Sequence, residues 1–82
     1  MNDRCVALFA SIHYVIRAEK VLRESGIWCD LVPTPRELSS DCGMAMELRI
    51  ADLEPARRLL EDPALSLQGI YQLTPQGPQE LA

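Results

Sequence analysis

The sequence predicts an α+β fold: a ferredoxin-like βαββαβ domain with a four-stranded antiparallel sheet and two helices on one face. Three observations predict it. The chain has 82 residues, enough apolar surface for one core only. Two segments with helical spacing each follow a strand-like segment. Over residues 44–51, Met, Leu and Ile alternate with Ala, Glu and Arg, as in a half-buried strand. We therefore expect a single domain over residues 1–74 and a flexible tail over residues 75–82.

The first strand, first helix and second strand are predicted over residues 4–32. Residues 4–10 form an apolar run that is too short for a buried helix, and Ser11 after it is a favourable helix N-cap. Apolar side chains then recur every three or four positions over residues 12–25, which predicts an amphipathic helix. Gly26 stands where helices commonly end in a left-handed residue, and residues 27–32 predict the second strand.

A long loop and three more elements complete the prediction. Residues 33–43 are dense in Pro, Ser, Asp and Gly, which is the composition of a loop. The alternating residues 44–51 predict the third strand, and Asp52 can cap a second helix that runs to about residue 61. Residues 67–74 predict the fourth strand.

The composition argues against several classes of function. The net charge of −4 and the pI near 4.8, with basic residues scattered along the chain, argue against sequence-independent binding of DNA or RNA. No segment approaches membrane-spanning length and the N-terminus lacks a secretion-signal pattern, so we expect a cytoplasmic location. Three cysteines without a CxxC pair argue against a disulfide scaffold and a zinc site, so no metal is expected.

The chemistry of the chain is expected at Cys42. It is the only cysteine predicted to lie in a loop, whereas Cys5 and Cys29 fall in strands, where a thiol commonly acts as a small buried apolar group. In the predicted topology, the 33–43 loop and the start of the first helix lie at the same end of the domain. Residues far apart in the sequence can therefore meet around this thiol.

A thiol becomes a useful nucleophile when a cation, a histidine or a helix N-terminus lowers its pKa. Arg36, in the same loop, and His13, at the start of the first helix, are the candidates for that role beside Cys42. Gly43 has no side chain and would let another molecule approach the sulfur closely. The alternatives stay open at this point: Cys42 as an ordinary turn residue, Arg36 as a surface arginine paired with an acid such as Glu37, and His13 as a solvated polar residue.

The residues around this loop form a recognisable motif. A Pro-x-Pro-Arg-Glu segment at residues 33–37 is followed by Ser-x-Cys-Gly at residues 40–43. Before it come a strand that ends in Phe-x-Ser at residues 9–11, a helix with Ala-Glu-Lys at residues 18–20, and a Gly-Ile turn. With these features the chain resembles the selenium/sulfur carrier protein-like family over more than half of its length.

The resemblance implies a bacterial domain that carries selenium or sulfur on Cys42. Pro35, Arg36, Glu37 and Gly43 would be the shared surroundings of that cysteine. It also implies partner proteins that donate and accept the sulfur or selenium atom. Such a carrier needs no bound cofactor, and a carrier rather than a stand-alone enzyme is expected.

Two functions from different classes are consistent with the sequence. In the first, the Cys42 thiolate accepts sulfur or selenium as a persulfide or perselenide. In the second, the chain is a non-catalytic interaction or regulatory module that binds a partner through the open face of the sheet or through the 33–43 loop. Thiol-based metal trafficking is a third hypothesis. A sheet covered on one side often pairs with a copy of itself, so a homodimer stays open without a motif that argues for it.

Overall fold

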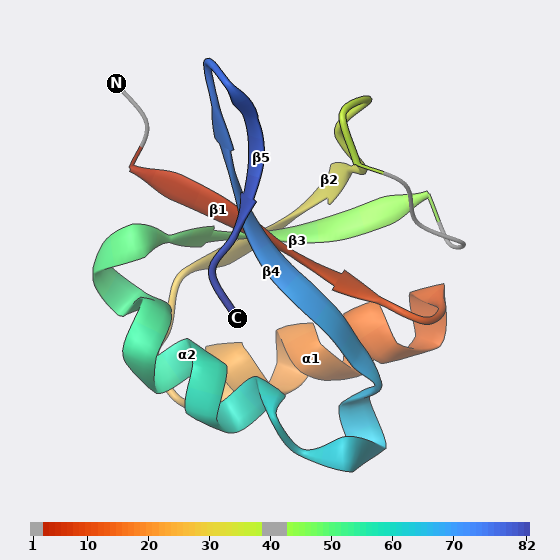
Figure 1. Cartoon of the computed structure of the whole chain (residues 1–82). Helices are drawn as coiled ribbons and strands as arrows, with labels where there is room; N and C mark the ends of the chain where they lie inside the picture. Colours follow the sequence, from red (N-terminus) through yellow and green to blue (C-terminus); the bar gives the residue numbers. More distant parts are fainter. Residues whose placement is uncertain (1–2, 39–42) are drawn as a thin grey trace.

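The computed structural model describes residues 3–38 and 43–82. Figure 1 shows the strands and helices in their order along the chain. The elements are β1 (Arg4–Phe9), α1 (Ile12–Glu24), β2 (Cys29–Pro33), β3 (Met44–Arg49), the 3-10 helix η1 (Ile50–Asp52), α2 (Leu53–Leu60), the 3-10 helix η2 (Pro63–Leu65), β4 (Leu67–Thr74) and β5 (Gly77–Glu80). No helix in the described part of the chain combines the length and the hydropathy that crossing a membrane requires.

The strands form one sheet in the order β2-β3-β1-β4-β5, and every neighbouring pair is antiparallel. Both helices lie against the same face of this sheet (Figure 1). The predicted α+β class with two helices is therefore confirmed. The predicted number of strands is wrong, because β5 continues the sheet beyond β4. A four-stranded ferredoxin-like sheet consequently does not describe the observed sheet.

The fifth strand is formed by residues that were expected to belong to a flexible tail. The hydroxyl of Thr74 donates to the carbonyl of Gly77 at 2.6 Å and accepts from the Gln76 N–H at 3.2 Å, which closes a tight turn between β4 and β5. Beyond β5 the N–H of Leu81 donates to the carbonyl of Ile70 at 2.7 Å, and the Leu81 side chain packs against the core. Main-chain pairing and one apolar anchor thus hold this segment to the sheet.

Several element boundaries also differ from the prediction. The second strand begins at Cys29 rather than at residue 27, since the residues directly after Gly26 complete the turn out of α1. The third strand ends at Arg49, and the chain then winds into η1 instead of extending to residue 51. Ser11 and Asp52 occupy the N-cap positions of α1 and α2, although neither side chain forms a capping hydrogen bond.

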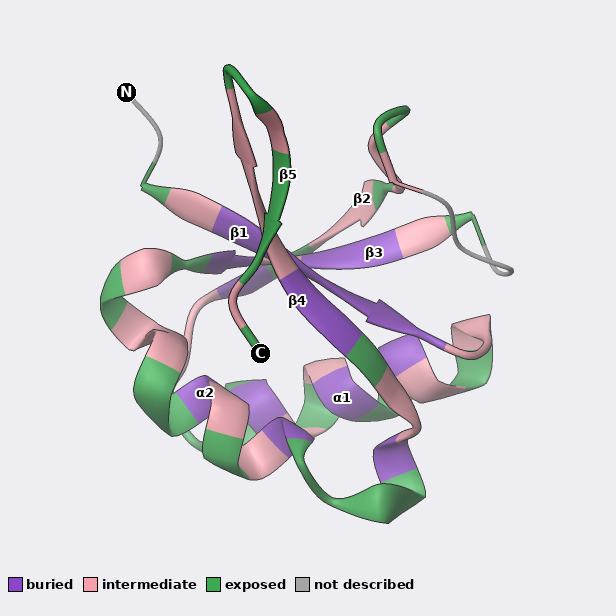
Figure 2. Ribbon diagram, in the orientation of Figure 1, coloured by how far each residue is buried: buried purple, intermediate pink, exposed green. Residues whose placement is uncertain are grey.

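Alternate residues of β1 build two apolar clusters on opposite faces of the sheet. Cys5, Ala7 and Phe9 join the main core beneath the helices, where Val15, Ala18 and Leu22 of α1 are fully buried, as their helical spacing predicts (Figure 2). Val6 and Leu8 point to the face without helices, called here the open face, and form a smaller cluster with Ala45.

The open face is partly covered by the chain that follows β2. Leu38, in the loop between β2 and β3, packs on the cluster of Val6, Leu8 and Ala45, and Tyr71 of β4 packs on it from the other side. The first part of this loop therefore folds back over the sheet. The same loop contains the predicted site.

Candidate functional site

The structure places the predicted loop residues as follows. Arg36 and Glu37 lie exposed in the turn after β2, whereas Pro35 is half-buried against the sheet. Gly43 is exposed where the chain enters β3. Cys42 lies outside the described residues, so its surroundings stay a prediction.

Two hydrogen bonds shape the ends of the loop. The Thr34 N–H donates to the carbonyl of Gly43 at 2.9 Å and thereby closes the base of the loop. The Leu38 N–H donates to the carbonyl of Pro35 at 3.0 Å, which turns the chain back over the open face. The backbone of this Pro-x-Pro-Arg-Glu segment is thus fixed by local hydrogen bonds and by the packing of Leu38.

Gly43 has a conformation that explains its place in the motif. Its φ of +72° is in the left-handed region, which a residue with a side chain adopts only with strain. A Cβ at this position would meet no other described atom within 4 Å. The backbone conformation, rather than crowding, therefore requires glycine here, and open space lies beside the residue that is bonded to Cys42.

The strand register places the base of this loop near the start of α1. In the β1–β3 ladder Ala7 lies opposite Met46, so the antiparallel strands bring Phe9 and Met44 to the same end of the sheet. His13 is exposed in the first turn of α1, directly after that end of β1. Whether His13 reaches Cys42 is not settled by this register and stays a prediction.

The two described cysteines have surroundings that suppress thiol chemistry. Cys5 and Cys29 are each 2% exposed and are free thiols. Burial, reinforced by the negative charge of Glu47, raises the pKa of Cys5 from 9.0 to about 11. Burial also raises the pKa of Cys29; Arg23 opposes that rise, and nearby carboxylates add to it. Both thiols therefore stay protonated at neutral pH.

The register also keeps these two cysteines apart. Leu48 of β3, the strand between β1 and β2, pairs with Cys5 on one side and with Cys29 on the other. Two strand spacings of about 4.8 Å separate their Cα atoms by roughly 10 Å, beyond the reach of a disulfide. Among the residues that the structure describes, no group of three or more His, Cys, Asp or Glu side chains is arranged to hold a metal ion.

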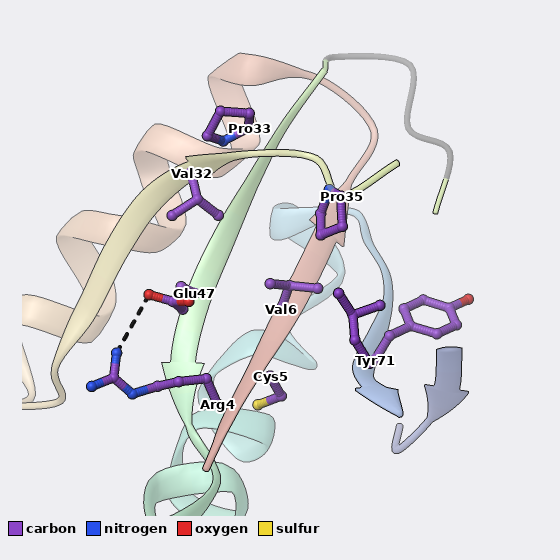
Figure 3. Close-up of a pocket in the computed structure, with 9 residues that line it drawn as sticks. Arg4, Cys5, Val6, Val32, Pro33, Pro35, Glu47 and Tyr71 are labelled. Carbon is purple, nitrogen blue, oxygen red and sulfur yellow. Dashed lines mark hydrogen bonds and ion pairs between the residues drawn. The ribbon is translucent and has the colours of Figure 1, made fainter. Parts of the chain in front are cut away.

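A groove lies on the open face, between the loop after β2 and strand β4 (Figure 3). Its volume is about 230 Å³, below the range of about 300–1,000 Å³ for small-molecule sites. It is lined by Arg4, Cys5, Val6, Val32, Pro33, Pro35, Glu47, Tyr71 and Leu73. Two prolines of the motif thus form part of its wall. No local sequence pattern predicts this groove, because it exists only where the loop folds over the strands.

Charged side chains close one end of the groove. Arg4 pairs with Glu47 at 3.4 Å, and its guanidinium carbon lies 4.5 Å from the centre of the Trp28 ring. Arg49, opposite Arg4 in the ladder, also lies over this ring, at 5.0 Å. Two like charges directly opposite each other normally destabilise a sheet. Here Trp28 and Glu47 provide contacts that offset the repulsion.

These features define a small α+β domain with two shielded thiols and a proline-walled groove beside the motif loop. Comparison with family models shows which family the protein is related to. The family model described as Putative Se/S carrier protein-like matches residues 4–72. Because the match covers most of the chain, the protein belongs to this family, and the resemblance predicted from the loop motif is confirmed. Neither a search of curated proteins nor a search of solved structures found a match.

Proposed function

We propose that the protein carries sulfur or selenium on Cys42, as a persulfide or a perselenide. The observation that carries this proposal is the match to the Se/S carrier family over residues 4–72. The thiols support it by elimination, because Cys5 and Cys29 are buried and have raised pKa values. A carrier needs one accessible thiol, and Cys42 is the remaining cysteine of the chain.

The transfer step is a thiol exchange without net oxidation. The Cys42 thiolate attacks the terminal sulfur of a persulfide on a donor protein, the donor's S–S bond breaks, and its electron pair leaves with the donor's own thiolate. Cys42 then carries the sulfur as Cys42–S–S⁻. The acceptor repeats the same exchange on Cys42. For selenium, the transferred atom is the terminal selenium of the donor.

The surrounding residues would tune this exchange. Arg36 is exposed and forms no ion pair with any described residue, so its guanidinium is available to stabilise an anionic sulfur in the same loop. His13 would accept the thiol proton if it reaches Cys42. Pro35 and Glu37 would hold the loop, and Gly43 would leave room for the partner's sulfur. A cytoplasmic location fits this scheme, since reducing conditions keep the thiol free.

Loading by a sulfur donor tests the proposal directly. The protein is incubated with a cysteine desulfurase and cysteine, alkylated, and weighed by intact mass spectrometry. The wild type and a Cys29→Ala control should gain one sulfur atom, and Cys42→Ala should gain none. A wild type that gains no sulfur, or a sulfur adduct that persists in Cys42→Ala, would refute the carrier function. Selenocysteine in place of cysteine, from which the desulfurase forms a perselenide, tests the selenium branch.

A second function is favoured by the groove on the open face. Its walls are mostly apolar, and Pro33 and Pro35 place it next to the motif loop, as a protein-interaction module would require. In that case Cys42→Ser would leave partner binding intact. Arg36→Ala, or an acidic residue at Val32, would abolish it. Loss of binding in Cys42→Ser would instead favour the carrier.

A further inference from the structure

One face of α1 differs in charge from the rest of the chain. His13, Ile16, Arg17 and Lys20 recur every three or four residues and therefore lie along one side of the helix. All four are exposed, and at 52% Ile16 is the most exposed large apolar side chain in the described part of the protein. We call these four residues the α1 face.

The basic residues of the α1 face are not neutralised by neighbours. On α2, Arg57 and Arg58 pair with carboxylates one turn away, and Arg23 of α1 pairs with Glu19 at 3.1 Å. Arg17 and Lys20 form no ion pair with the residues that the structure describes. Arg17 instead lies over the Tyr14 ring, with its guanidinium carbon 5.9 Å from the ring centre.

Such a pattern is characteristic of a contact surface. The protein as a whole has a net charge of −4, so two cations without an ion pair on one side of α1 are a local exception. The exposed Glu24 follows Lys20 one turn later on the same side, and no ion pair joins the two side chains. An exposed apolar residue within a rim of cations provides burial at the centre and electrostatic steering at the edge. An acidic partner surface with a small apolar pocket is complementary to this arrangement.

The position of the α1 face relates it to the motif loop. α1 begins directly after β1, and the β1–β3 register places the end of β1 beside the start of β3, where Gly43 enters the sheet. A protein bound to the first turns of α1 would therefore lie near the end of the sheet that the loop reaches (Figure 1). Docking and sulfur transfer could then occur in one complex.

We propose that the α1 face is the docking surface for the protein that donates sulfur, which binds through an acidic patch. This inference rests on the proposed carrier function for the identity of the partner. The contact itself needs no thiol, and binding can be measured separately from transfer.

The test measures binding of a purified cysteine desulfurase to the full chain by calorimetry. The parent and every variant carry Cys42→Ala, so that no sulfur is transferred. Lys20→Glu should weaken the Kd about tenfold at low salt, since a reversed charge faces an acidic partner. Ile16→Ala should weaken it about fivefold at both low and high salt. The matched control Arg58→Glu makes the same charge change at an exposed site on α2 and should stay within about twofold of the parent.

The outcomes separate docking from transfer. An unmeasurable affinity of the parent, equal weakening by Arg58→Glu, or unchanged binding of Lys20→Glu and Ile16→Ala would each overturn the docking surface. The carrier function would be refuted, and the docking surface would still be supported, if the protein with Cys42 restored gained no sulfur while binding still depended on the α1 face. Thermal unfolding of every variant shows whether the fold is retained.

Discussion

The three cysteines should react with an alkylating agent at very different rates in the native protein. At about pH 7.5, a thiol with an ordinary pKa of 9.0 is roughly 3% thiolate. Burial raises the pKa of Cys5 to about 11, which leaves a thiolate share of roughly three in ten thousand at the same pH. Ionisation alone therefore predicts that Cys42, with an ordinary pKa, reacts about 100-fold faster than Cys5. The shielding of Cys5, which is 2% exposed, widens the difference.

The assay is a time course with iodoacetamide, quenched at intervals and resolved by peptide mass spectrometry. Cys29 should also react more slowly than Cys42, because Cys29 is buried and burial raises its pKa. The same time course in concentrated urea is the control, in which all three thiols should react alike. Native Cys5 or Cys29 alkylated as fast as Cys42 would refute the argument that the fold leaves one thiol reactive. A pH profile of the Cys42 rate would give its pKa directly.

Three further predictions concern stability. Gly69→Ala should lower the free energy of unfolding by about 2–4 kcal/mol, because the new Cβ would approach the Tyr71 ring to 2.8 Å at a φ of +156°. Urea unfolding, followed by the fluorescence of Trp28, measures this loss, and adding Tyr71→Ala should relieve part of it. Unchanged stability of Gly69→Ala would contradict the predicted clash with Tyr71. The pKa of Cys5 is higher in the folded protein than in the unfolded chain, so its contribution to the free energy of unfolding is fully present below pH 9.0 and disappears as the pH rises toward about 11. Urea unfolding at several pH values should show the wild type losing up to about 2 kcal/mol of stability relative to Cys5→Ala across this window. Parallel pH curves for the two proteins would show that burial does not hold the thiol neutral. Phe9→Ala should lower the free energy of unfolding by about 3–5 kcal/mol, because the ring is fully buried between the sheet and the helices. The same urea unfolding measures this loss. A loss under about 1 kcal/mol would contradict the placement of Phe9 in the core.

Periodicity predicted the elements that bury side chains. The helical spacing of Val15, Ala18 and Leu22 identified the buried side of α1, and the alternation around Met46 and Leu48 identified the strand β3. These patterns are reliable because one face of each element must leave water. The boundaries were less certain, since they depend on main-chain turns that many sequences can form.

The fifth strand and the groove could not be predicted in this way. Residues 77–80 carry no apolar alternation, and β5 is held by main-chain pairing with β4 and by Leu81 after it. The groove depends on Pro35, in the loop after β2, lying beside residues of β1, β3 and β4. Such features arise from tertiary contacts, and composition indicates only that residues 33–43 form a loop. The motif within that loop indicated a resemblance to the family, and the family match confirmed that resemblance.

The separation of the thiols bears on the proposed chemistry. A persulfide on Cys42 would be lost if a second thiolate of the chain attacked its inner sulfur, because that attack forms an internal disulfide and expels hydrosulfide. The attack requires a thiolate that can reach the sulfur. Cys5 and Cys29 are both buried on the helix side of the sheet, and burial keeps both protonated. A carrier with this fold can therefore contain three cysteines and still release its cargo only to a thiol of another protein.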